Sequence, residues 1–75
     1  MKAYVLINVR AGKNRGVVKQ VQQVKGVKHV NACWGRPDVF AFVDVENEKT
    51  LAEAVLDQIQ AIDGIESTDT HIMID

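Results

Sequence analysis

The chain has 75 residues, of which 47% are hydrophobic and 25% are charged, and its formal net charge at pH 7 is −1. This length fits one small domain, and the hydrophobic share excludes a disordered chain. The single cysteine excludes an internal disulfide framework, and no apolar run approaches the roughly 20 residues that a transmembrane helix needs. We therefore predict one cytoplasmic domain over residues 1–75, without a membrane partner.

The charged residues are divided sharply along the chain. Residues 1–37 contain eight of the nine Lys and Arg residues and no acid, whereas residues 38–75 contain all ten acids and only Lys49. Basic and acidic elements lying side by side in the fold would explain this division, and so would complementary packing between subunits. Nucleic-acid binding by the basic half is disfavoured, because the acidic half would repel phosphates.

The first part of the chain predicts a strand, a helix and a second strand. Residues 2–9 alternate with apolar side chains on both faces, which is typical of a central strand. Valines at helical spacing then predict an amphipathic helix, with Asn14 as its N-cap and Gly26 closing its far end. Residues 27–34 follow as a second, more polar strand.

The remaining residues predict a turn, a strand, a helix and a last strand. Residues 35–38, "GRPD", form the turn, because proline lacks an amide donor and Gly and Asp are common turn residues. Residues 39–45 alternate as the third strand, and Asn47 is a suitable N-cap for the second helix. Residues 65–74 form the last strand. The apolar stripe of the second helix comprises Leu51, Val55, Ile59 and Ile62.

The element order β-α-β-β-α-β predicts a ferredoxin-like α+β sandwich, a four-stranded antiparallel sheet with both helices on one face. The first and third strands are the most apolar and belong in the centre. The helix-free face then shows four large apolar side chains, a larger patch than soluble monomers usually expose. We expect a second copy to cover it by sheet-to-sheet packing, as in a dimeric α+β barrel. The predicted dimer interface comprises Tyr4, Leu6, Phe40 and Phe42.

Three segments carry a recognisable pattern: "AYVLINVRAG" (3–12), "VKGVKHVNACWGRPDVFAFVDV" (24–45) and "IDGIESTDTHIMID" (62–75). In their order and spacing they resemble the effector-binding (RAM) domain of the Lrp/AsnC family of transcription regulators. The resemblance implies that the domain dimerises through its sheets and that dimers assemble into rings, often octamers. It also implies that small effectors, typically amino acids, bind between dimers.

The resemblance implies a ligand-binding site as well. Gly35 and Asp38 match the family's Gly-x-x-Asp hairpin, in which Asp38 would accept a hydrogen bond from an ammonium group. Thr68 and Thr70 match the family's Thr-x-Thr, whose hydroxyls would complete the polar lining. Arg36, which is not a fixed family residue, is placed to pair with a carboxylate. From the residues alone, Asp38 also fits a turn former, and threonines are ordinary on an edge strand.

Family members usually carry an N-terminal helix-turn-helix domain, whereas here the first strand follows Met1 at once. We therefore expect a stand-alone effector domain with no DNA-binding domain and no direct sequence-specific DNA binding. Three roles fit this arrangement: sensing of amino acids, co-assembly with full-length family members, and a role unrelated to transcription.

No catalytic, metal or cofactor site is predicted. His29 and Cys33 lie about 13 Å apart along one strand, at ~3.3 Å per residue, which is too far for one ion or for a nucleophile and its base. We expect Cys33 to be a reduced, half-buried thiol. Three alternatives stay open: an ACT-like regulatory domain, a purely structural assembly module, and a small dimeric α+β barrel enzyme of the oxygenase or isomerase type. For the enzyme, Tyr4 and Asn8 are the only polar candidates on the covered face.

Overall fold

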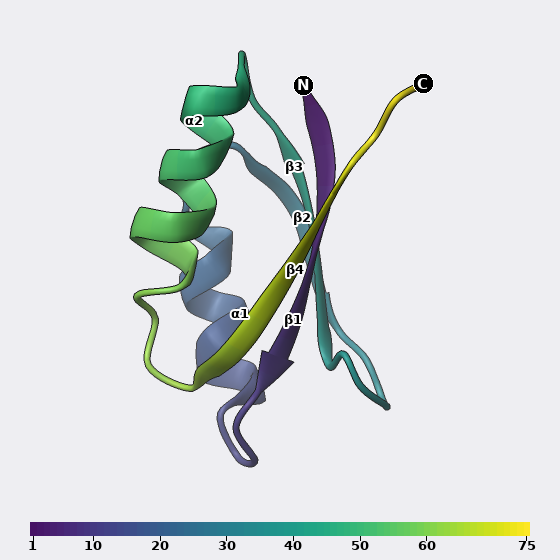
Figure 1. Ribbon diagram of the computed structural model, residues 1–75. Helices are drawn as coiled ribbons and strands as arrows, with labels where there is room; N and C mark the ends of the chain where they lie inside the picture. The colour runs from purple at the N-terminus through teal and green to yellow at the C-terminus, as the bar shows by residue number, and fades with distance from the viewer.

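Two helical segments cover one face of a four-stranded antiparallel sheet in the computed structural model, which describes residues 1–75 (Figure 1). The strands lie in the order β2-β3-β1-β4, so β1 and β3 are central, and the predicted β-α-β-β-α-β order is confirmed. None of the helices has the length and apolar composition needed to cross a membrane. The elements are β1 (Lys2–Val9), α1 (Asn14–Gln22), β2 (Val27–Ala32), β3 (Val39–Asp44), α2 (Glu48–Ala52), η1 (Glu53–Ile59) and β4 (Ile65–Ile72).

Strict alternation in the two central strands determines where the core lies. Every second residue of β1 from Ala3 to Val9 is at most 1% exposed, and the same holds for β3 from Val39 to Val43. Full burial of each Val or Ile side chain contributes about 1.5–3 kcal/mol of transfer free energy. The helices complete the core with Val17, Val21, Leu51, Ala54, Val55 and Ile59.

The start of α1 differs from the prediction. Asn14 is not the N-cap: it is the first helical residue, and Lys13 occupies the cap position without a side-chain hydrogen bond. A tight turn causes this shift, because the Lys13 amide donates to the Arg10 carbonyl at 3.0 Å and the Lys13 carbonyl already accepts from Val17 at 2.9 Å. The helix therefore begins one residue earlier than its side chains suggest.

The second helix starts as predicted and then changes from α-helical to π-helical geometry. The Asn47 side chain accepts a hydrogen bond from the Thr50 amide at 2.9 Å, which confirms Asn47 as the N-cap. After α2 the chain continues as a π-helical segment, η1, rather than as one regular α-helix. The buried residues Leu51, Val55 and Ile59 recur every four positions, slightly more than one α-helical turn. The wider π turns keep this stripe on the core side.

Replacing Asn47 by alanine should lower the free energy of unfolding by about 1 kcal/mol, because the Thr50 amide then loses its acceptor. Asn14 provides a matched control, since it is the same residue at the start of the other helix but is not the N-cap. We expect Asn14→Ala to change stability by less than about 0.5 kcal/mol. Urea denaturation followed by circular dichroism measures the free energy of unfolding of both variants. Equal decreases in the two variants would contradict the assignment of Asn47 as the N-cap.

Candidate functional site

The hairpin between β2 and β3 is anchored to the end of β1 by Asp38. Its backbone amide donates to the Ile7 carbonyl at 3.1 Å, and its carbonyl accepts from the Cys33 amide at 2.6 Å. Its Oδ1 accepts from the Val9 amide at 2.9 Å, and its side chain is only 16% exposed. The predicted turn role of Asp38 is therefore confirmed, and its carboxylate is held in a fixed orientation.

Arg36 extends from this hairpin across the end of β1 to the start of β4. Its Nη1 donates to the Val9 carbonyl at 3.1 Å and lies 3.5 Å from the Asp38 carboxylate. Its Nη2 donates to Glu66 Oε1 at 2.7 Å, and this hydrogen bond is the main reason that the pKa of Arg36 is raised. We call Arg36, Asp38 and Glu66 the hairpin cluster. Sequence reasoning missed Glu66, because no local pattern indicates a partner 30 residues away.

The two predicted threonines lie elsewhere on the subunit. Thr68 and Thr70 face the helices, opposite Ile7 and Val5 of β1. Thr68 Oγ1 accepts a hydrogen bond from Gln60 Nε2 at 2.7 Å. Thr70 lines a small pocket of about 170 Å³ between the second helix and β4. Within one subunit, neither hydroxyl is hydrogen-bonded to the hairpin cluster.

The tip of the hairpin projects from the protein. Gly35 has φ of 113°, a left-handed conformation that favours glycine at this turn. Trp34 is fully exposed, with a relative accessibility of 105%. Cys33 is exposed too, so the expectation of a half-buried thiol is wrong. The reason is that β2 is an edge strand and ends at Ala32, before the chain reaches this cysteine.

The helix-free face of the sheet carries the predicted apolar side chains. Tyr4 is 46% and Phe40 41% exposed, and Leu6 and Phe42 beside them are partly exposed. The rings of Tyr4 and Phe42 pack against each other with centroids 5.4 Å apart. Two shallow pockets of about 410 and 310 Å³ lie on this face, and both are lined by Tyr4 and Phe40. We call this surface the open sheet face.

Both histidines of the chain also lie on the open sheet face. His29 stacks on Phe42, with ring centroids 6.1 Å apart, and lines the larger pocket. His71 lies opposite Tyr4 across the sheet and lines the smaller one, and its Nε2 is 3.1 Å from Asp69. The prediction that Tyr4 and Asn8 are the only polar side chains here is therefore wrong.

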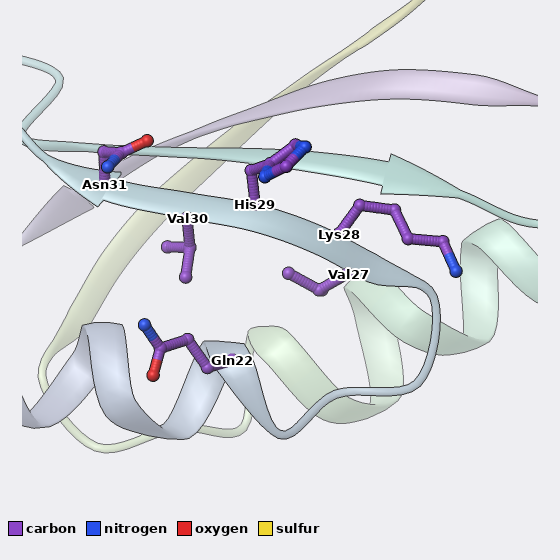
Figure 2. Close-up of a pocket in the computed structure, with 6 residues that line it drawn as sticks. All are labelled: Gln22, Val27, Lys28, His29, Val30 and Asn31. Carbon is purple, nitrogen blue, oxygen red and sulfur yellow. The ribbon is translucent and has the colours of Figure 1, made fainter.

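A bulge in β2 interrupts the alternation of its side chains at His29. Alternation puts Val27, His29 and Asn31 on one face, but the register shifts between Val27 and His29. Figure 2 shows the result: Val27 and Val30 lie on the side of β2 that faces α1, and His29 and Asn31 stand on the opposite side. Gln22 of α1 and Lys28 complete a pocket of about 360 Å³ along this free edge.

Ion pairs join the basic half of the chain to the acidic half within the fold. Asp63 accepts from Arg10 at 3.2 Å and lies 3.4 Å from Lys13 Nζ. Hydrogen bonds from Arg10 and then Lys13 lower the pKa of Asp63. A lowered carboxyl pKa means that the pairs stabilise the fold above the ordinary aspartate range and that this contribution is lost as the pH falls through the lowered pKa. With Arg36 and Glu66, these pairs support the explanation of basic and acidic elements lying side by side.

Comparison with known proteins gives a match over nearly the whole chain. The model of the Lrp/AsnC ligand binding domain matches residues 2–75. An uncharacterized HTH-type transcriptional regulator from Pyrococcus furiosus is 31% identical over 71 residues, which cover 95% of this chain and 48% of that protein. The chain thus spans about half the length of the curated relatives it matches.

Solved structures share the fold. The crystal structure of a protein from Thermus thermophilus has a TM-score of 0.94 at 24% identity, covering 99% of this chain and 92% of that one. A complex of a transcriptional regulator from Neisseria meningitidis with L-Met has a TM-score of 0.84 at 16% identity, covering 99% of this chain and 49% of that one. These likenesses confirm the predicted ferredoxin-like sandwich.

Proposed function

The chain belongs to the Lrp/AsnC ligand-binding domain family, and on that premise we propose that it is a non-catalytic, cytoplasmic module that binds an amino acid and couples binding to subunit assembly. The observation that carries the proposal is the open sheet face, where Tyr4 and Phe40 remain 46% and 41% exposed in the lone subunit. A face of this kind on a small domain marks an interaction site.

A second copy of the chain is the partner that we propose for the open sheet face. Two copies related by a twofold axis would place the same aromatic surface on both sides of the interface. Aromatic side chains such as Tyr4, Phe40 and Phe42 are enriched in the buried core of interfaces. The helices lie on the far side of the sheet (Figure 1). They would remain free for contacts between dimers, in a ring of the octameric kind.

The hairpin cluster provides groups that suit an amino acid. Asp38 uses Oδ1 for the Val9 amide and the contact with Arg36, so we assign its other oxygen to the ligand ammonium. Arg36 would exchange Glu66 for the ligand carboxylate, because guanidinium groups bind carboxylates well. A free amino acid carries both of these groups, and the regulator from N. meningitidis forms a complex with one, L-Met.

The separation of the threonines from the hairpin cluster suggests a site that is shared between subunits. Thr68 and Thr70 lie under the second helix, so within one chain they do not line the same cavity as Asp38. We propose that the Gly35 hairpin of one dimer and the threonine side of another meet at the effector. Such a site exists only in the assembly, and its ligand therefore favours the assembly.

Transcriptional regulation would then act through a partner that binds DNA. The curated relatives are HTH-type regulators about twice as long as this chain. We propose that co-assembly with full-length family members, through contacts between dimers, transmits the effector state to them.

A panel of the twenty amino acids, tested by native mass spectrometry and thermal denaturation, examines the proposed function. We expect at least one amino acid to bind, to shift the oligomer distribution and to raise the melting temperature. At a ligand concentration 100 times Kd, binding to the folded state adds about 2.7 kcal/mol of stability. The N-acetyl and amide derivatives of that amino acid are matched controls, since each lacks one charged group, and both should bind weakly. A panel in which no amino acid changes either quantity would contradict the proposal.

A further inference from the structure

We propose that the dimer formed through the open sheet face is sensitive to pH, with His29 as the residue whose protonation separates the subunits. This inference rests on the proposed function, because it requires that a second copy covers this face. It adds regulation by acidification to an assembly otherwise controlled by its effector.

His29 lies inside the surface that a partner must cover. Its ring stacks on Phe42 at a centroid distance of 6.1 Å and an interplanar angle of 25°. It shares a pocket of about 410 Å³ with Tyr4, Phe40 and Asn31. Figure 2 shows the His29 ring on the side of β2 turned away from α1. Any copy that buries the Tyr4 and Phe40 rings must therefore also cover this imidazole.

The charged groups around His29 do not compensate a positive charge. Lys28 precedes it at the bulge of β2 and adds a like charge. Asp44 of β3 lies directly across from Lys2 of β1 in the strand register, and it forms no ion pair with His29. His29 itself takes part in no ion pair, and its nearest aromatic neighbour is neutral.

His71 differs from His29 in this respect. It lies on β4, where Asp69 is 3.1 Å from its Nε2 and offsets its charge when it is protonated. The pair can accompany His71 into an interface as a neutral unit. We therefore assign the pH response to His29 and not to His71.

The size of the effect follows from proton linkage. Histidine is the side chain type that gains a positive charge on mild acidification, and burial without a counter-charge disfavours that charged form. Each protonated subunit must then release one proton before the faces can join, so two protonated subunits release two. Between pH 7.5 and pH 5.5 this requirement raises the dimer Kd by about 100-fold.

Sedimentation equilibrium at pH 7.5 and pH 5.5, at one ionic strength, tests the inference, with circular dichroism confirming that the chain stays folded. We expect the wild-type Kd to rise by about 100-fold on acidification. His29→Gln should remove this rise, because glutamine is polar and does not titrate. His71→Gln is the matched control on the same face and should retain the wild-type response.

The outcomes separate this inference from the proposed function. A dimer whose Kd is the same at both pH values would overturn the pH switch and leave the proposed assembly intact. A pH response that persists in His29→Gln would overturn the assignment to His29. Folded monomers at both pH values and at millimolar concentration would overturn the switch together with the proposed dimer.

Discussion

Replacing Phe40 by aspartate should convert the proposed dimer into a folded monomer, with the dimer Kd raised at least 100-fold. Phe40 lines both pockets of the open sheet face and is 41% exposed in the lone subunit. The substitution places a carboxylate in the interface of each copy, and burial of an unpaired charge is strongly unfavourable. The lone subunit keeps this position exposed to water, so its own fold should survive. Sedimentation velocity at pH 7.5 measures the dimer Kd, and circular dichroism at the same pH shows whether the subunit is folded.

Leu56→Asp is the matched control for Phe40→Asp. Leu56 is also an exposed large apolar residue, at 58%, but it belongs to η1 on the helix side of the sheet. It should leave the dimer Kd within about threefold of the wild-type value, since surface substitutions away from an interface change little. Dissociation by Leu56→Asp, or a Phe40→Asp protein that remains dimeric, would contradict the proposed interface.

The sequence predicts the fold correctly in each segment where one hydrophobic periodicity dominates. In β1, both predicted faces were correct: Val5 and Ile7 are fully buried, and Tyr4 is exposed. In β3 the same alternation buries Val43 and leaves Phe40 exposed. A shift of one residue would exchange the two faces, so the apolar pattern determines the register of a half-covered sheet. The pattern therefore indicated both the core and the exposed apolar face of the sheet.

The parts that the sequence did not predict depend on contacts between distant segments or on local irregularities. The Arg36–Glu66 pair requires the hairpin and the start of β4 to meet across β1, which only the assembled sheet defines. The bulge before His29 interrupts the alternation of β2, and His29 lies on the open sheet face. The change to a π-helix after Ala52 has no single residue that marks it. Hydrophobic periodicity alone does not determine features of these kinds.

Part of the divided charge is paired within the chain, and part of it remains exposed. Near the hairpin, the cations Arg10, Lys13 and Arg36 already have acidic partners in the same chain. On the outer surfaces the division persists: α1 has exposed Arg15 and Lys19 and no acid, and the second helix has exposed acids. These acids are Glu48, Glu53 and Asp57. Side-by-side pairing and complementary packing between subunits are therefore compatible, and the second remains a proposal.

Asp38 carries two roles that different substitutions separate. As the hairpin anchor it accepts from the Val9 amide at 2.9 Å, and as the proposed ammonium acceptor it provides a negative charge. Asp38→Ala removes both and should lower the free energy of unfolding by about 1–3 kcal/mol, because the Val9 amide loses its partner in a partly buried position. Asp38→Asn keeps an amide oxygen for Val9 and removes only the charge.

Asp38→Asn should therefore keep nearly wild-type stability while it weakens amino-acid binding by about 10–100-fold, the amount that a charged hydrogen bond of roughly 1.5–3 kcal/mol contributes. Isothermal titration with the amino acid that gives the largest thermal shift measures the affinity, and urea denaturation measures the stability. Asp44→Asn is the matched control, a half-buried aspartate at the far end of β3, the strand that follows Asp38, and it should bind normally. Wild-type affinity in Asp38→Asn, or an equal loss in Asp44→Asn, would show that Asp38 only shapes the turn and that the effector binds elsewhere.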